Sequence, residues 1–364
     1  MNGTTLMQAS HQWASRPNDE RFVSLIDMKA HFENVRENSR EAVVSSRKIQ
    51  AIPMSDNKGL EIHGPNGHGY APTNWAFGQL AQLAGAPAAY LRQLPSPIAA
   101  DCINYGMQYS RDVSEVGVLL YKNGDNVMRA ATGPRYGRIW NNDIVGALVA
   151  NFGDGVTPGG FKVPGEFGKA VEVTKANTTL YAGDRDMFVF LADEEHRIEI
   201  PNRRNGEAGS MARGFFVWNS EVGSATFGLA TFLFDYVCCN RIVWGAQGFE
   251  QITIRHTASA PDKWLEEMRP ALIEYSNSSA KGVIEGVEKA RAARIDNVDE
   301  FLAKRFGKRV GPELQAIHMT EEGRPIETLW DATVAVTAKA RVIEHQDTRV
   351  ELEREGGELM KLAA

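Results

Sequence analysis

The feature that most constrains the fold is a series of short apolar runs, rich in β-branched and aromatic residues, between residues 116 and 254. Turn-forming residues separate most of these runs, and Asn123, Gly124 and Asp125 between the first two are typical of a tight hairpin. Such closely spaced strands favour an antiparallel sheet. The predicted strands are residues 116–121, 127–131, 170–174, 179–181, 187–192, 197–200, 215–219 and 249–254, and two more are expected within residues 42–63.

Elsewhere, apolar residues recur every three or four positions, which predicts helices. The same spacing of Phe227, Ala230, Thr231 and Phe234 favours a buried helix over residues 225–236. From Pro261 the pattern is helical to the end, and Gly356 is expected to interrupt or end the last helix. The other predicted helices are residues 22–35, 73–84, 88–94, 98–109, 141–152, 263–276, 280–293, 298–306, 328–344 and 346–355.

Together these patterns predict an α+β fold with a central antiparallel β-sheet and flanking helices, followed by a C-terminal helical region. Residues 1–20 are polar and lack an apolar period, so we expect a flexible arm there. Residues 21–260 form the predicted α+β body, and residues 261–364 form the predicted helical region.

Composition excludes several classes of protein. The chain has a net charge of −6 and no strongly basic segment, although a groove lined by a few arginines stays compatible with that total. Cys102, Cys238 and Cys239 lack metal-ligand spacing, and their small number fits a reducing compartment. The first residues lack a signal-peptide pattern, and the longest apolar run falls short of the roughly 20 residues that span a bilayer. We therefore expect a cytoplasmic protein that binds no membrane, no metal and no recognisable cofactor.

The densest functional-looking stretch is residues 133–142, where Arg135, Tyr136, Arg138 and Trp140 precede a predicted helix. Arginines bind phosphates, and aromatic rings stack on bases. The alternative interpretation is a structural turn, with Trp140 in the core and Asn141 or its neighbour capping the helix.

Other segments also allow two interpretations. Arg203 and Arg204, with Arg213 beyond them, indicate either a mobile basic hairpin or a solvated turn. Asn219 or Ser220 is expected to cap a helix, and no nucleophile motif surrounds Ser220. His256, at a strand end, is either a base or a structural residue. Two further groups are candidates for ligand binding, although we interpret them mainly as solvated turns or helix ends. The candidates for a metal site are Asp184, Asp186, Glu194, Glu195 and His196. The candidates for an anion site are Lys304, Arg305, Lys308 and Arg309.

Several of these stretches, taken in order, resemble the phage- and plasmid-borne domain of unknown function 932 family. The resemblance covers roughly residues 20–350. Its most specific segments are Arg135-Tyr136 with Ile139 and Asn141, residues 182–185, 213–215, 219–223, 238–243 and 254–257, and the Leu329–Arg341 region. It implies a mobile-element protein without an established activity, and the family context favours DNA transactions.

The leading hypothesis is a nucleic-acid-binding protein of a bacterial host cell, which binds or anneals single-stranded DNA, in recombination for instance, as a homo-oligomer. We assign it no catalytic residue. The alternatives are a protein-binding factor that acts on host defence and a metal-dependent enzyme that acts on nucleic acid. The predicted nucleic-acid-binding residues are Arg135, Tyr136, Arg138, Arg203, Arg204, Arg213, Asn219, Arg241, Arg255 and His256.

Overall fold

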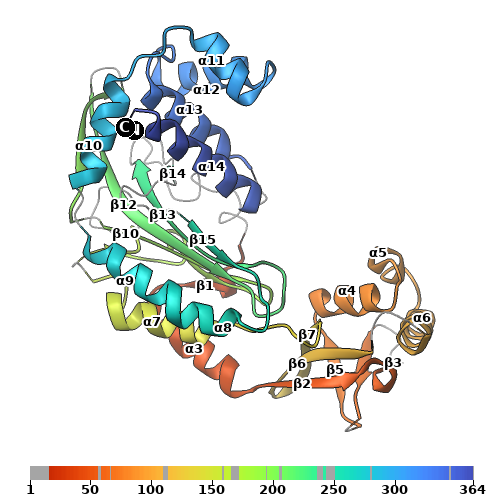
Figure 1. Cartoon of the computed structure of the whole chain (residues 1–364). Coiled ribbons are helices and arrows are strands. Elements are labelled where there is room, and N and C mark those ends of the chain that lie inside the picture. The colour runs from red at the N-terminus through yellow and green to blue at the C-terminus, as the bar shows by residue number, and fades with distance from the viewer. Residues whose placement is uncertain are drawn as a thin grey trace.

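The computed structural model describes residues 16–363 of the chain, apart from residues 56–58, 66, 110–113, 158–159, 165–171, 194, 205–206, 236–240, 243–250, 279–280 and 344–345. Most of the expected arm, Cys238, Cys239 and Glu194 therefore lie outside the described residues. The α+β prediction is confirmed. The chain forms an arch, with the central sheet between a smaller sheet unit and the C-terminal helices (Figure 1).

The N-terminal sheet unit (residues 39–132) contains six strands in the order β2-β6-β7-β5-β4-β3. Its neighbouring strands are antiparallel, except that β5 and β7 are parallel. Leu80 and Ile103, from its helices, share one apolar cluster with Val118 and Met128 of the strands. Its elements are β2 (Ser39–Ser45), η2 (Ser46–Lys48), β3 (Gln50–Pro53), β4 (Leu60–His63), β5 (Gly69–Pro72), α4 (Asn74–Leu83), α5 (Ala88–Leu91), α6 (Ser96–Tyr109), β6 (Glu115–Asn123) and β7 (Asp125–Thr132).

Among the described residues, the central sheet has nine strands, all paired antiparallel. Its main path is β1-β9-β10-β12-β13-β14, while β8, β11 and β15 pair with β10, β12 and β13 respectively. The strands are β1 (Arg21–Phe22), β8 (Phe161–Lys162), β9 (Leu180–Ala182), β10 (Met187–Asp193), β11 (Ile198–Arg204), β12 (Glu207–Asn219), β13 (Phe227–Asp235), β14 (Arg241–Ile242) and β15 (Gln251–Ile254). The helical elements around them are η1 (Asn18–Glu20), α3 (Leu25–Glu37), α7 (Asn141–Phe152), α8 (Ala260–Lys263), the π-helical turn η3 (Trp264–Met268) and α9 (Arg269–Asn277).

The two faces of the central sheet carry different side chains. Toward α3, α7 and the α8–α9 segment, Val217 and Leu229 pack in the main core with Leu148 and Trp264 (Figure 1). The alternate strand positions form a ladder of aromatic rings with centroids 4.8 to 5.7 Å apart, made by Phe188, Phe190, Phe216, Trp218 and Phe232. Because both faces of the sheet are buried here, strands β10 and β13 are apolar at nearly every position.

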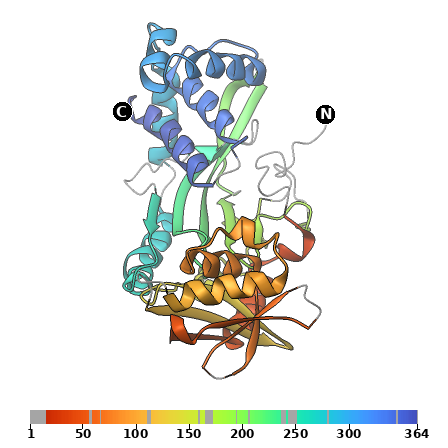
Figure 2. The same cartoon turned by 90° about the vertical axis from the view of Figure 1, so that its right-hand side faces the viewer.

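The C-terminal helices form the other end of the arch (Figure 2). Trp330 and Val334 of the buried helix α13 pack against Ile198 of β11 and Met211 of β12, which ties the helical region to the sheet. Thr328 and Asp331 form a capping box at the start of α13. The helices are α10 (Lys281–Ala292), α11 (Val298–Phe306), α12 (Val310–Glu322), α13 (Leu329–Ala340) and α14 (Gln346–Lys361).

The predicted helix over residues 225–236 is wrong, because this segment is strand β13. Eight residue pairs join β13 to β12, from Met211 opposite Asp235 to Trp218 opposite Gly228. The helical spacing arose because both faces of the strand are covered, which hides the period of two. Other differences are smaller: residues 172–174 form no strand, β11 continues to Arg204 through the expected turn, α14 runs through Gly356 to Lys361, and α12 was not predicted.

A close backbone approach within the aromatic ladder leads to the first prediction. A Cβ atom added to Gly228 would lie 1.9 Å from the Trp218 ring, so Gly228→Ala must displace that buried ring. We expect a loss of about 2 kcal/mol in the free energy of unfolding, measured by urea denaturation. Gly146→Ala, in helix α7 with nothing within 4 Å of the added carbon, is the control and should be neutral or slightly stabilising. Equal stability of the two variants would contradict this packing.

Candidate functional site

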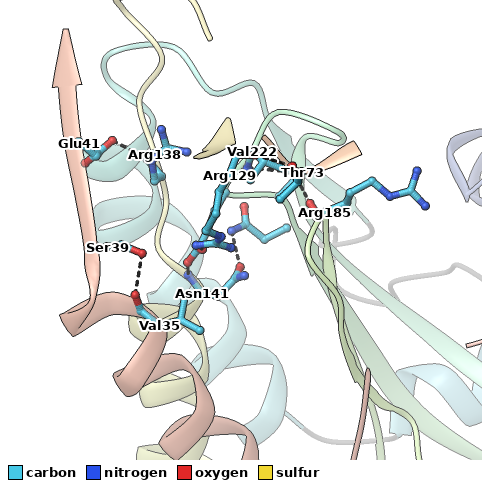
Figure 3. Close-up of polar contacts among 12 residues, drawn as sticks. Val35, Ser39, Glu41, Thr73, Arg129, Arg138, Asn141, Arg185 and Val222 are labelled. Carbon is cyan, nitrogen blue, oxygen red and sulfur yellow. Dashed lines mark hydrogen bonds and ion pairs between the residues drawn. The ribbon is translucent and has the colours of Figure 1, made fainter. Parts of the chain in front are cut away.

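The polar junction between the N-terminal sheet unit and the central sheet is centred on Glu221, which is only 2% exposed. One carboxylate oxygen, Oε2, accepts a hydrogen bond from Arg129 Nη1 of β7 at 2.8 Å. The other, Oε1, accepts from the backbone N–H of Asn141, the first residue of α7, at 2.9 Å (Figure 3). A negative charge at a helix N-terminus is favourable. Glu221 therefore caps α7 from a distant part of the sequence, and the expected caps, Asn141 and Asn142, do not.

The carbonyl of Val222 joins helix α4 to the same turn. It accepts hydrogen bonds from Trp75 Nε1 at 3.0 Å and from Gln79 Nε2 at 2.7 Å. Gln79 Oε1 in turn accepts from the backbone N–H of Ala131 at 2.9 Å. Gly223 follows with a φ of +83°, in the region that favours glycine. The side chains of α4 and the backbone of residues 219–224 thus form one hydrogen-bonded unit.

Ser220 closes the turn and does not cap a helix, because a strand follows it. Its Oγ donates to the carbonyl of Arg185 at 2.6 Å and accepts from the backbone N–H of Ser224 at 2.9 Å. Ser224 Oγ donates to the same Arg185 carbonyl at 2.9 Å. Two hydroxyl groups therefore hold the backbone of the turn between β9 and β10, and Figure 3 shows the Arg185 side chain extending away from this network.

Three segments that carry the family resemblance meet at this junction. Tyr136 donates its hydroxyl to the carbonyl of Ser220 at 2.8 Å, and its ring stacks on His256 with centroids 4.8 Å apart. His256 Nδ1 lies 3.0 Å from the carbonyl of Gly137. Asn219 donates Nδ2 to the carbonyl of Ile139 at 2.8 Å and to Asn141 Oδ1 at 2.7 Å. The structure therefore brings together the segments that carry Tyr136, Asn219 and His256.

The predicted arginines do not share one exposed groove. Arg138 is buried, and its Nε donates to Glu41 Oε1 at 2.7 Å. Arg213 is buried away from the junction, where it pairs with Asp193 at 3.2 Å and donates to the Ser278 carbonyl at 2.5 Å. The Arg213 guanidinium is needed inside the fold, because Asp193 would otherwise be left in the interior without its cationic partner. The partner of Arg138, Glu41, is exposed.

Other predicted residues are exposed or lie outside what the structure describes. Arg135 and Arg255 are exposed beside Tyr136 and His256. Arg203 and Arg204 end β11 and Arg241 begins β14, but their side chains lie outside the described part of the chain. Nucleic-acid binding by these residues stays a prediction.

A cleft of about 390 Å³ lies between α4 and the β9–β10 turn, next to the junction. Two exposed arginines line it, Arg92 from the N-terminal sheet unit and Arg185 from the central sheet. No carboxylate is among the described residues that line this cleft. The others are Asn74, Trp75, Gly78, Gln79 and Gln82. The cleft therefore offers two positive charges and several hydrogen-bond donors with no opposing charge in its walls.

Arg92 is held in place by its own neighbours. Its Nε donates to Asn74 Oδ1 and its Nη2 to the Asn74 carbonyl, both at 2.9 Å. The guanidinium carbon lies 5.1 Å from the centroid of the Phe77 ring. The third nitrogen, Nη1, takes part in neither bond.

Two of the sequence candidates for a metal, Asp186 and His196, form contacts with other residues. Asp186 pairs with Arg16 at 2.8 Å, and His196 lies 3.0 Å from Asp193. Among the described residues, no group of three or more histidine, cysteine, aspartate or glutamate side chains is placed to hold a metal ion. No helix in the described part of the chain is both long and apolar enough to cross a bilayer.

Comparisons of the chain with protein-family models, with curated proteins and with solved structures found no match. The predicted family membership is therefore neither supported nor excluded.

The ion pair at the junction leads to the second prediction. Glu221→Gln leaves the guanidinium of Arg129, whose side chain is only 11% exposed, without its carboxylate, so the free energy of unfolding should fall by about 3 kcal/mol in urea denaturation. Glu358→Gln, which breaks the exposed pair with Lys361, is the matched control and should change stability by less than about 0.5 kcal/mol. Similar small losses in both variants would show that the junction does not depend on this pair.

The third prediction concerns His256. Burial lowers its pKa, and the nearby Arg138 guanidinium acts in the same direction, so the folded chain binds a proton on this ring less readily than the unfolded chain. Its contribution to stability is therefore full above about pH 6.5 and declines as the pH falls below that value. Between about pH 7.5 and pH 5, the wild type should lose more stability than His256→Asn, in urea denaturation at both values. Parallel losses would contradict a neutral, buried His256.

Proposed function

We propose that the chain binds single-stranded nucleic acid, with the phosphate backbone in the cleft between α4 and the β9–β10 turn. The observation that carries the proposal is that Arg92 and Arg185, from two structural units, line the same cleft. No carboxylate is among the described residues that line it. Guanidinium groups present a planar fork of donors that matches phosphate oxygens.

The walls of the cleft are fixed before a ligand arrives. The two bonds to Asn74 orient Arg92, and the hydroxyls of Ser220 and Ser224 hold the backbone that carries Arg185. Binding then loses little conformational freedom in the backbone, which favours affinity. The acidic total charge of the chain does not oppose this proposal, because a local field depends on nearby charges.

Further cations lie close to the same turn. Gln79 in the cleft and Tyr136 at the junction each have an atom 3.5 Å from the position that a Cβ on Gly223 would take. Arg135, which directly precedes Tyr136 in the chain, and Arg255, which directly precedes His256, are exposed. A nucleic-acid strand that leaves the cleft along the junction would pass near these two predicted residues. An annealing protein of a mobile element needs such an extended binding path.

The fourth prediction tests the cleft directly. Arg185→Gln removes one positive charge and no side-chain hydrogen bond among the described residues, and Arg92→Gln in the same chain removes the second. In fluorescence anisotropy with a labelled single strand, the double variant should bind at least about tenfold more weakly at about 50 mM salt, with a salt slope shallower by about 0.7 for each lost phosphate contact.

The control is Lys308→Gln with Arg309→Gln, the same loss of charge at exposed positions between α11 and α12. This variant should keep the wild-type affinity and slope. Absence of wild-type binding at low salt, or an equal loss in the control, would contradict the proposal.

A further inference from the structure

A second pocket shares a wall with the cleft. It has a volume of about 420 Å³ and lies between the β3–β4 hairpin, α4 and the start of α6. Asn74 and Arg92 line both the pocket and the cleft. Most of its other lining residues are apolar, and they include Leu60, Phe77 and Leu91.

The cleft and the pocket differ in chemistry in the way that the phosphate and the base of a nucleotide differ. The cleft is polar and cationic, whereas the pocket is mainly apolar with an aromatic ring, Phe77, in its wall. Arg92 stands between them, held by the bonds of its Nε and Nη2 to Asn74 and over the ring of Phe77. A phosphate on Arg92 and Arg185 would leave its own nucleoside beside the pocket.

We infer that the pocket binds one unpaired nucleobase of the strand whose phosphate lies on Arg92 and Arg185. This inference rests on the proposed function and adds to it that one base of the bound strand is unpaired. Charge complementarity places the phosphate, and the apolar walls then receive the flat, weakly polar ring attached to it. A base in a duplex is stacked and paired, so it cannot enter without being extruded. The site therefore selects single strands.

The pocket also predicts little sequence preference. Its polar side chains are few, with Asn74, Arg92 and Ser96 among lining residues that are otherwise apolar or glycine. Asn74 and Arg92 are already bonded to each other. Stacking and apolar contact do not distinguish bases well, because every base has an aromatic face. Base identity then matters less than the presence of a base.

The test compares strands of equal charge. Labelled strands of about 12 nucleotides are prepared with normal bases, with abasic sites throughout, and as a matched duplex, and their affinities for the full chain are measured by fluorescence anisotropy at low salt. The wild type should bind the base-bearing strand about tenfold more tightly than the abasic strand, and the duplex more weakly than the base-bearing strand.

A variant that fills the pocket provides the second arm. Ala71 lines the pocket but is exposed, so Ala71→Phe can fill the space without replacing a core side chain. It should lower affinity for the base-bearing strand to the level of the abasic strand while leaving the salt slope unchanged, and Ala71→Ser should behave as wild type.

The outcomes separate the two proposals. Equal wild-type affinity for base-bearing and abasic strands, or duplex binding as tight as single-strand binding, overturns the nucleobase pocket while phosphate binding at the arginines stands. No binding of any strand at low salt overturns the proposed function and this inference with it.

Discussion

The relative placement of the two sheets depends on one buried carboxylate. Glu221 neutralises Arg129 of the N-terminal sheet unit and caps helix α7, which packs under the central sheet. A buried charge is stable only with its partner, so this geometry tolerates little variation. The next carbonyl, that of Val222, binds two side chains of α4. The position of α4, and hence one wall of the candidate cleft, follows from the same turn.

This constraint explains why a stretch rich in arginine and aromatic residues is mainly structural. Arg138 lies over the rings of Tyr136 and Trp140 and pairs with Glu41, and His256 stacks on the ring of Tyr136. Arginine and aromatic side chains, which bind nucleic acid on a protein surface, also make cation–π and stacking contacts with one another in an interior. The cations available to a ligand are those that form no ion pair within the described fold, and Arg185 is the clearest of these.

Local signals predicted much of the fold. The bounds of α7 and α11 agree with the apolar period, and Thr73, the first residue of the predicted helix over residues 73–84, caps α4. Strand β13 could not be recognised, because burial on both faces removed its alternation. Helix α12 was missed because Gly311 and Pro312 near its start are typical of a loop. The cleft was beyond prediction, since tertiary packing alone brings Arg185 beside α4.

The most direct measurement is a crystal structure of the chain with a short oligothymidylate. Our account predicts a phosphate between the guanidinium groups of Arg92 and Arg185, with the attached thymine in the pocket beside Phe77. A strand bound elsewhere, such as on the basic end of α11 near Lys308, with the cleft and pocket empty, would contradict it.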